Sequence, residues 1–386
     1  MHPRLIRIGL VMAHSLAFYR AILRGVKTFA IERPEWVLTP IAPERRALEL
    51  ARPLRCSGYI AHVYSEPLAS KLRTLRRPVV NVSGILSDVA FPRVVVDHVE
   101  VGRQAARHLL ERGPRHLAFV GYPRHEFSVE RERGLREIAQ TTAVEVSTFL
   151  EHHRRIEDPT GLWRWNQALE DWLRKLPKPV GILASHDTQG AQVSEYCRQL
   201  GLSVPDGVSI VGVDDDDLLC ELARPSLSSV ALPGERIGYE AARLLHRWLE
   251  GEPPRNPSLV LSPGGVVVRQ SSHLPAVRDR HVAEAVRFIH AHSHQPIKVS
   301  DVLRAVPIAR RALERRFRKW LQRSIFDEIS RVHLDLARRL LISTDLAMTE
   351  VADRAGFRDG RHLSIAFRQS TGMTPTRFRN RFRLRP

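Results

Sequence analysis

Acidic and hydroxyl side chains follow short apolar runs at several places in the first two thirds of the chain. Ser15, Asp187 and Asp214 each come within three residues of the end of such a run. A carboxylate accepts two hydrogen bonds at once, and neighbouring hydroxyl groups of one ligand can supply both. The four consecutive acids at 214–217 are a poorer fit for a metal ion, because adjacent side chains do not converge easily on one ion. These residues therefore suit the recognition of neighbouring hydroxyl groups.

Catalytic and metal-binding patterns are weak in this sequence. Ser185, His186 and Asp187 are neighbours in the chain, and neighbours cannot adopt the geometry of a catalytic triad. Three histidines alternate at 290–294, where the side chains of a helix diverge. The sequence has no phosphate-binding loop, no dinucleotide fingerprint and no HExxH motif, and its three cysteines lack metal-ligand spacing. We therefore expect no enzyme activity, no metal and no cofactor.

Positive charge is concentrated near the C-terminus. The 386 residues include 60 Lys and Arg against 42 Asp and Glu, a net charge of +18. Residues 279–386 alone carry 23 Lys and Arg against 11 Asp and Glu. Such an excess indicates a polyanionic partner, or at least a basic surface. No apolar run reaches the roughly 18 residues needed to cross a bilayer, and no cleavage-like site follows the N-terminus, so we expect a reducing cytoplasm.

Alternating strand and helix patterns fill the first 270 residues. Parallel strands covered on both faces are expected from this alternation, and the number of elements favours two similar lobes. Ligands of such sheets bind beyond the carboxyl ends of the strands, which is where the polar side chains above lie. The expected strands are 8–12, 59–63, 79–82, 117–120, 180–184 and 209–213, and the expected helices are 19–31, 99–110, 128–139, 189–200 and 237–249.

Several strings in this region resemble the effector domain of LacI/GalR-type repressors. They are LGLSVPDGVSIVGVDD at 200–215, RPSLSSV at 224–230 and GYEAA at 238–242, together with an R-x-x-G helix start at Arg131 and Gly134. The resemblance covers residues 5–270 and implies a periplasmic-binding-protein fold, with two Rossmann-like lobes hinged around a small ligand. Repressors of this family carry an N-terminal helix-turn-helix, for which this chain has no room before Leu5.

The same resemblance implies the ligand site. It assigns sugar binding to Arg131, Asp187 and Asp214, with Ser15, Phe18 and Tyr19 bordering the end of the first strand. Each residue has a plainer alternative: a solvated acidic loop for Asp214, a surface charge for Arg131, a helix cap for Asp187, and core packing for the two aromatic residues.

The C-terminal segment contains an imperfect repeat of two helix-turn-helix patterns. Each copy has a Ser or Thr followed by an acid at an expected helix start, namely Ser300 in the first copy and Thr349 in the second. Gly356 is expected to take a positive φ in the second turn. A basic amphipathic helix then follows, with Leu313 and Phe317, or Leu363 and Phe367, on its inner face. A helix expected at 326–341 would separate the copies as a strut.

This segment resembles the AraC-type DNA-binding domain over 282–382, on the strings TEVADRAGF at 349–357 and FRQSTGMTP at 367–375. The resemblance implies two recognition helices in successive segments of the major groove. Arg377, Arg379 and Arg381 would contact the DNA backbone or only solvent. Which side chains would contact bases and which would contact phosphates stays open. The expected DNA-contacting residues are Arg310, Arg311, Arg315, Gly360, Arg361, His362, Ser364 and Arg368.

A LacI-like sensor followed by an AraC-type reader is similar to the family of bacterial xylose operon regulators. We expect a sensor at 1–272, a linker at 273–280 and a reader at 281–386. The first lobe would comprise 5–97 with 233–256, and the second 98–230 with 257–272. The resemblance implies a homodimeric, nucleoid-associated transcription regulator that binds double-stranded DNA and a pentose such as xylose, contacts RNA polymerase if it is an activator, and does not bind membranes. The alternatives are a different ligand, a sugar-binding protein and an enzyme.

Overall fold

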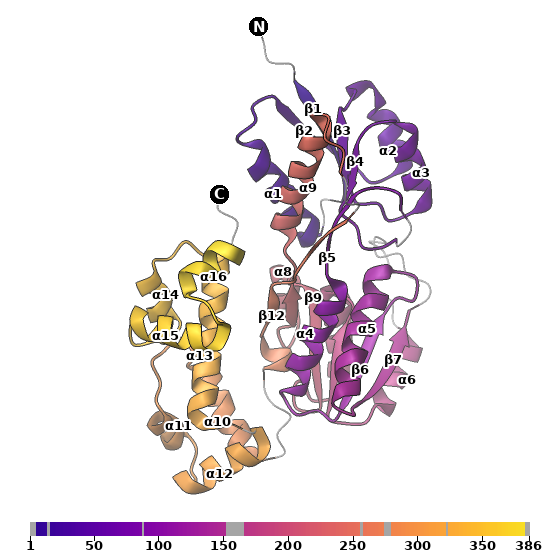
Figure 1. The fold of residues 1–386 in the computed structure, drawn as a ribbon. Coiled ribbons are helices and arrows are strands. Elements are labelled where there is room, and N and C mark those ends of the chain that lie inside the picture. Colours follow the sequence, from indigo (N-terminus) through magenta and orange to yellow (C-terminus); the bar gives the residue numbers. More distant parts are fainter. Residues whose placement is uncertain are drawn as a thin grey trace.

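Two α/β lobes and a helical domain make up the computed structural model (Figure 1). It describes residues 5–13, 16–86, 89–151, 166–254, 258–273, 279–321 and 323–382. Among the helices of these residues, none is both long enough and apolar enough to span a bilayer. The expected fold class, a two-lobed α/β domain followed by an all-α domain with two helix-turn-helix motifs, is confirmed.

The first lobe is built on six parallel strands in the order β11-β5-β4-β3-β1-β2. The strands are short and mostly apolar, and the four central ones, β1, β3, β4 and β5, are buried at most positions, as expected for a parallel sheet covered on both faces. The strands are β1 (Ile6–Val11), β2 (Trp36–Ile41), β3 (Gly58–Ala61), β4 (Val79–Asn81), β5 (Arg93–Val96) and β11 (Ser258–Leu261), and the helices are α1 (Ala17–Ala30), α2 (Arg45–Leu50), α3 (Glu66–Thr74) and α9 (Gly234–Leu249).

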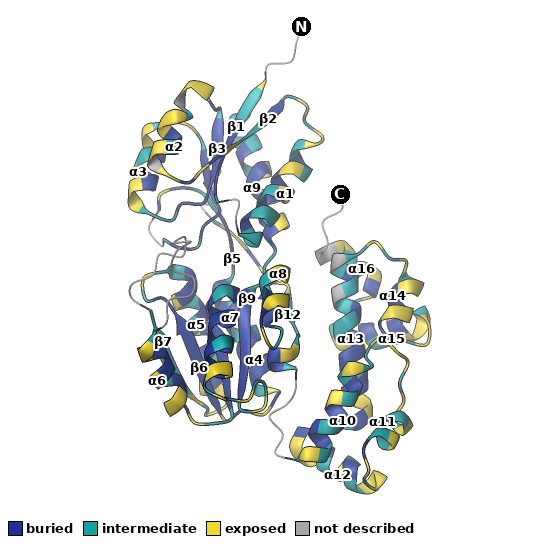
Figure 2. Ribbon diagram, turned by 180° about the vertical axis from the view of Figure 1, so that it is seen from behind, coloured by how far each residue is buried: buried dark blue, intermediate teal, exposed yellow. Residues whose placement is uncertain are grey.

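The second lobe repeats this plan with the order β12-β10-β9-β8-β6-β7, in which β12 is antiparallel to β10. Its central strands are buried at almost every position and are dark blue in Figure 2. The strands are β6 (His116–Gly121), β7 (Glu145–Leu150), β8 (Val180–Ala184), β9 (Val208–Asp214), β10 (Ser228–Ala231) and β12 (Gly265–Val267), and the helices are α4 (His98–Leu110), α5 (Glu126–Thr141), α6 (Gln167–Lys175), α7 (Asp187–Gln199) and α8 (Asp217–Leu222).

The expected lobe boundary at 257 is wrong. β11 pairs in parallel with β5 of the first sheet, from Ser258 opposite Arg93 to Leu261 opposite Val96. The chain then crosses to the second sheet, where β12 pairs with β10. Both segments are short apolar runs, so the sequence does not indicate which sheet accepts each one.

The lobes contact one another at the first turn of α5. The backbone N–H groups of Glu126 and Phe127 donate to the carbonyl groups of Ile85 and Gly84, at 3.0 and 2.8 Å. Arg93 of the first lobe also pairs with Glu126 at 3.0 Å, and both side chains are largely buried. These contacts occupy N–H groups that the start of a helix leaves without an intrahelical partner.

Helices α4 and α5 pack unusually closely. A Cβ atom at Gly102 would lie 2.0 Å from the carbonyl oxygen of Arg131, and one at Gly134 would lie 1.9 Å from that of Val99. Only glycine fits at such distances, because real Cβ atoms are not found that close to a backbone oxygen. The two helices are therefore locked together as one piece of the second lobe.

Seven helices form the described part of the C-terminal domain. A short 3-10 helix, η2 (Gln270–Ser272), ends the second lobe before it. The helix α13 contributes Ile325, Ile329 and Val332 to the core of the first helix-turn-helix, and Leu334, Ala337 and Leu341 to that of the second. The expected strut is thus confirmed. The helices are α10 (Arg280–Ala291), α11 (Val299–Ala305), α12 (Arg310–Leu321), α13 (Ile325–Ser343), α14 (Met348–Arg354), α15 (Gly360–Thr371) and α16 (Pro375–Phe382).

Both expected helix caps in the repeat are wrong by two residues. The N-caps are Lys298 and Ala347, so that Ser300 and Thr349 lie inside the first turn. The following acid caps instead: the Asp301 carboxylate accepts from the Lys298 N–H, and Glu350 makes the same contact with Ala347, both at 2.7 Å. Elsewhere in the repeat, the positive φ expected of the glycine at 356 and the burial of the four inner-face apolar residues are confirmed.

Candidate ligand-binding and nucleic-acid sites

Arg131 lies on α5 with 3% of its side chain exposed, and it faces the carboxyl ends of the second sheet. Its Nη1 donates to the carbonyl oxygen of Ser185, and its Nη2 lies 3.3 Å from His98 Nδ1 and 4.0 Å from Asp214 Oδ1. The guanidinium carbon lies 4.8 Å from the centre of the Phe127 ring. The Nε atom has no hydrogen-bond partner among the described residues. A buried donor without a partner is suited to an oxygen atom of a ligand.

Asp214 ends β9 in a strained conformation. Its φ is +116°, and that of Asp215 is +55°, both of which are uncommon for residues other than glycine. Strain of this kind is characteristic of functional sites, where it aims a side chain. Burial raises the pKa of Asp214 to about 7, although Arg131 acts to lower it. The carboxyl group is therefore balanced between its neutral and ionised forms near neutral pH.

Asp187 is held by its own protein neighbours. Its Oδ1 accepts from Ser229 Oγ at 2.6 Å, and its Oδ2 accepts from the Asp216 N–H at 2.8 Å. A Cβ atom at Gly212 would lie 2.3 Å from Oδ1, so glycine makes room for the carboxyl group. The alternative that Asp187 caps α7 is wrong, because His186 is the N-cap. Asp187 instead braces the turn that follows β9.

Two aromatic candidates lie on the first lobe. Tyr19 is 7% exposed, and its hydroxyl group lies 2.6 Å from Nε2 of the buried His62. Phe18 is half-buried, with its ring centre 5.6 Å from that of Tyr19. Ser15 lies outside the described residues. The structure thus gathers Arg131 and the two acids on one lobe and places these aromatics on the other.

Sequence reasoning missed two histidines and one serine at these sheet edges. His62 comes directly after β3, and His98 comes two residues after β5. The carboxyl-end rule, applied to every strand, finds both. Burial lowers the pKa of His98 well below its usual value, and Arg131 adds to this effect. Ser229 lies within β10, where only the tertiary structure shows that it reaches Asp187.

The expected DNA-contacting side chains lie on the outer faces of α12 and α15. Every one of them is exposed except Gly360, the half-buried first residue of α15. Arg310 pairs with Glu314 at 2.9 Å, and the ring of His362 lies 2.9 Å from Asp359 Oδ2. The other four arginines, Arg311, Arg315, Arg361 and Arg368, form no ion pair or hydrogen bond with other described residues through their side chains. Free guanidinium groups on a helix of this kind are available to phosphates and base edges.

The C-terminal arginines have different surroundings. Arg379 donates to the carbonyl oxygen of Leu346 at 2.7 Å and so ties α16 to the turn before α14. Arg377 is exposed, and the side chain of Arg381 lies outside the description.

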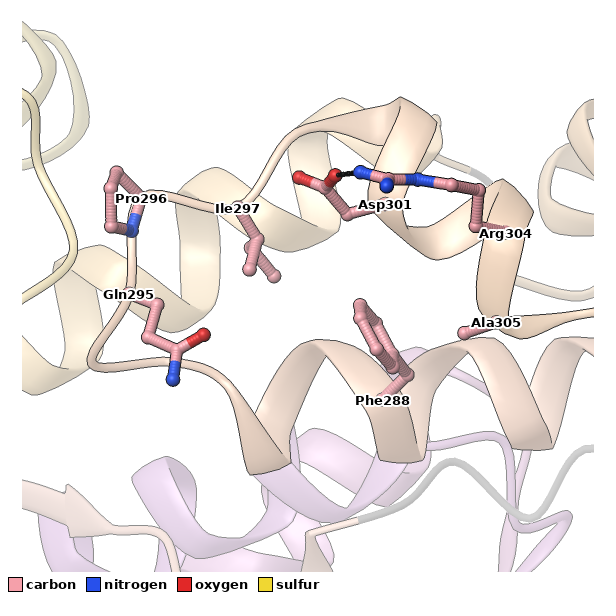
Figure 3. A pocket seen from close by; sticks show the side chains of 7 residues that line it. All are labelled: Phe288, Gln295, Pro296, Ile297, Asp301, Arg304 and Ala305. Atoms are coloured by element: carbon pink, nitrogen blue, oxygen red, sulfur yellow. Dashed lines mark hydrogen bonds and ion pairs between the residues drawn. The ribbon is translucent and has the colours of Figure 1, made fainter.

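A shallow pocket lies inside the reader, between α10 and α11 (Figure 3). Phe288 and Ile297 form its apolar wall, and an ion pair between Asp301 and Arg304 lies along its rim. None of its lining residues belongs to the lobes, so the pocket is separate from the Arg131 site.

Comparison with known families matches both halves of the chain. The periplasmic binding protein-like domain family matches residues 106–272. The helix-turn-helix domain family matches residues 302–381.

Individual relatives match this chain along most of their length. The xylose operon regulatory protein of Escherichia coli K12 is 29% identical over 384 residues, which cover 97% of each chain. The protein of the same name from Haemophilus influenzae is 29% identical over 75% of each chain.

Solved structures give the same result. The structure of the xylose-binding transcription activator xylR aligns with this chain over 100% of both chains, with 27% identity and a TM-score of 0.63. The complex of the transcriptional regulator CelR with cellobiose matches 70% of this chain and 86% of its own, with 27% identity and a TM-score of 0.56.

The likenesses to the Escherichia coli regulator and to the xylR structure extend over both the lobes and the C-terminal domain. Over its full length the chain is therefore similar to XylR-like transcription regulators, and it joins a periplasmic binding protein-like domain to a helix-turn-helix domain.

Proposed function

We propose that this chain is a sugar-responsive, DNA-binding transcription regulator whose ligand is a pentose, with xylose as the first candidate. The observation that carries the proposal is the Arg131 site. A buried guanidinium with an open Nε donor faces the Asp214 carboxyl group at 4.0 Å. One supplies donors and the other supplies acceptors, which together suit neighbouring hydroxyl groups. The names of the similar regulators support xylose within this class.

The DNA-binding half of the proposal rests on α12 and α15. Each presents exposed, unpaired arginines while its apolar face fills the domain core. In a homodimer on double-stranded DNA, these helices would lie in successive major-groove segments. The ligand would act by preferring the closed arrangement of the lobes, because a ligand shifts an equilibrium only through unequal affinity for its states.

A different sugar is the second candidate. The CelR complex holds cellobiose in a sensor of the same fold, at 27% identity to this chain. A direct comparison of several sugars is therefore needed to identify which one this chain binds.

The first experiment is a thermal-shift panel on the purified full chain. The panel contains xylose, arabinose, ribose, glucose, cellobiose and ribonucleosides at equal concentrations. A ligand that binds only the folded state raises the Tm as ln(1 + [ligand]/Kd). A rise with xylose or another single pentose is the expected result. A rise of the Tm with cellobiose or nucleosides alone would contradict a pentose as the ligand and identify that compound class in its place. No rise with any compound would contradict the sugar assignment.

The second experiment places the ligand at Arg131. The variant Arg131→Ala removes a buried charged donor, so sugar affinity should fall by about 2 kcal/mol or more, roughly 30-fold, with DNA affinity retained. The matched control is Arg136→Ala on the same helix, where Arg136 pairs with Glu132 at 2.7 Å near the surface. Calorimetric titration measures both. Equal affinities for the two variants would show that the sugar binds elsewhere.

A further inference from the structure

Side chains from the sensor and the reader meet at the C-terminal end of α4. This contact, here called the junction cluster, has no part in the Arg131 site. The reader lies beside the second lobe (Figure 1). The cluster consists of His108, Glu111, Arg112 and Ser272 from the sensor, of His273 directly after it, and of His290, Arg323, Glu328, Arg331 and Asp335 from the reader.

Glu328 is the centre of the reader side. Its side chain is 3% exposed, and it accepts from Arg323 at 3.1 Å and from Arg331 at 2.6 Å. His290 Nε2 lies 3.4 Å from the same carboxylate. Burial acts to raise the pKa of Glu328, but Arg331 and His290 outweigh it and hold the pKa well below its usual value. The buried carboxylate is therefore ionised, and it fixes α10 against α13.

Arg112 is the centre of the sensor side. Its side chain is 4% exposed, with Nε donating to the Ser272 carbonyl oxygen and Nη1 donating to that of His108 at 2.7 Å. Its Nη2 has no hydrogen-bond partner among the described residues. Burial, and after it Arg331, lower the pKa of Arg112 to about 9, and Glu111 opposes both effects. Charges of the two domains are thus close enough to act on one another.

Two direct contacts cross between the domains. Arg323 Nη2 donates to the carbonyl oxygen of Glu111, which follows α4, at 3.3 Å. The ring of His273, just after η2, lies with its centre 3.9 Å from that of His290 on α10. Because Arg323 and His290 both contact Glu328, these two contacts converge on one buried carboxylate.

The opposite end of α4 belongs to the candidate ligand site. His98 is the first residue of α4, and its Nδ1 lies 3.3 Å from Arg131 Nη2. The helix has 13 residues, so it spans about 20 Å between the ligand site at its first residue and the junction cluster at its last turn. Close packing at Gly102 and Gly134 leaves no room for α4 to slide along α5. A displacement at one end of α4 must therefore reach the other.

We propose that the junction cluster is a docking surface for this chain's own reader, and that α4 couples the ligand site to α13 through it. α13 contributes to the hydrophobic cores of both helix-turn-helix motifs, so a shift of α13 moves both recognition helices together. The docking part concerns the chain without ligand. The coupling part rests on the proposed function, because it requires a sugar response. The two parts are tested separately.

Docking is tested on the full chain without ligand, with the double variant His273→Ala/Arg323→Gln. The variant removes the two cross-domain contacts and leaves the Glu328–Arg331 pair in place. The matched control is His292→Ala/Arg304→Gln. His292, just after α10, contacts the Phe288 carbonyl oxygen, and Arg304 pairs with Asp301 on α11, so neither residue contacts the junction cluster among the described residues.

Small-angle scattering measures the radius of gyration, and hydrogen exchange follows the last turn of α4. Released docking should increase the radius by about a tenth and speed exchange at 107–112 at least tenfold, with the control within twofold of wild type. Thermal melts of both variants exclude unfolding as the cause. An unchanged radius and unchanged exchange in the double variant would overturn the docking surface.

Coupling is tested by operator affinity with and without xylose, on a labelled duplex selected by the wild-type protein from random sequences. The double variant should bind xylose within twofold of wild type, while the ligand-induced change in operator affinity falls to about onefold. Retention of the wild-type change would refute coupling through the junction cluster. A wild-type protein that responds to no sugar would refute the proposed function and the coupling with it, while scattering still decides the docking surface.

Discussion

Asp214 shows how single residues set the chemistry of the candidate ligand site. Its backbone is strained, and burial and Arg131 act in opposite directions on its carboxyl group. An ionised carboxylate can accept hydrogen bonds from two hydroxyl groups, whereas a neutral carboxyl group carries a proton that competes with them. A group with a pKa of about 7 is thus a point at which pH and ligand binding are linked.

At this scale we predict that sugar affinity depends on pH. The pKa of Asp214 is raised, so the group is mostly neutral at pH 6 and mostly ionised at pH 8. If the ionised form binds the ligand, the Kd should rise about tenfold from pH 8 to pH 6. Calorimetric titration of xylose at several pH values measures the change. Asp214→Asn should bind more weakly but without this dependence, and a constant wild-type Kd would contradict a role for the ionised carboxylate.

The orientation of the proposed recognition helices α12 and α15 depends on how each helix packs against its neighbours in the domain. Leu313 and Phe317 anchor α12, and Leu363 and Phe367 anchor α15, each fully buried. The N–H groups at the start of the preceding helices are capped by Asp301 and Glu350. These anchors fix which face of each recognition helix is turned outward, and on both helices that face carries the free arginines.

At this scale we predict that both recognition helices contribute to DNA affinity. Arg311→Ala on α12 and Arg361→Ala on α15 should each weaken binding of the selected duplex and lower the slope of log K against log[salt] by about 1. Fluorescence anisotropy over a range of salt concentrations measures both effects. Arg338→Ala is the control, because Arg338 is held by Asp335 and Ser370 within the domain. An unchanged slope in both test variants would remove these residues from the interface.

The whole sensor is held together across its lobes by a small contact region. Gly84 and Ile85 accept from the first turn of α5, and Arg93 pairs with Glu126 there. Gly84 also makes room for His98, whose Nε2 would lie 2.5 Å from a Cβ atom at that position. Because these contacts join residues of different lobes, an opening of the lobes at this point would break them.

At this scale we predict that Glu126→Gln weakens sugar binding indirectly, through the ion pair between the lobes and not through a contact with the sugar. Loss of the partly buried ion pair should lower the population of the closed state, so that the Kd rises roughly three- to tenfold. The control is Glu130→Gln, one turn later on α5, where Glu130 pairs only within its helix with Arg133 at 3.3 Å. Calorimetric titration compares the two variants. An equal effect of both would show that the ion pair across the lobes is not what closes the sensor.

Six of the described strands (β1, β3, β4, β6, β8 and β9), their alternation with helices, the two lobes and the repeat in the C-terminal domain could be predicted from the sequence. These properties follow from local patterns: apolar runs that make buried strands, amphipathic spacing that makes helices, and a repeated motif. Leu313, Phe317, Leu363 and Phe367 could be assigned to the core for the same reason, since their spacing places them on one helical face.

Long-range contacts decided the rest. β11 belongs to the first sheet because its backbone pairs with β5. Ser258 lies opposite Arg93, which is 165 residues earlier in the chain, and no local sequence pattern indicates that pairing. Asp187 became a brace rather than a helix cap because Ser229, from another strand, reaches its carboxyl group. The junction between sensor and reader likewise depends on side chains far apart in sequence. Local spacing thus determined the elements and their faces, whereas partners, burial and charge balance were decided only when the chain folded.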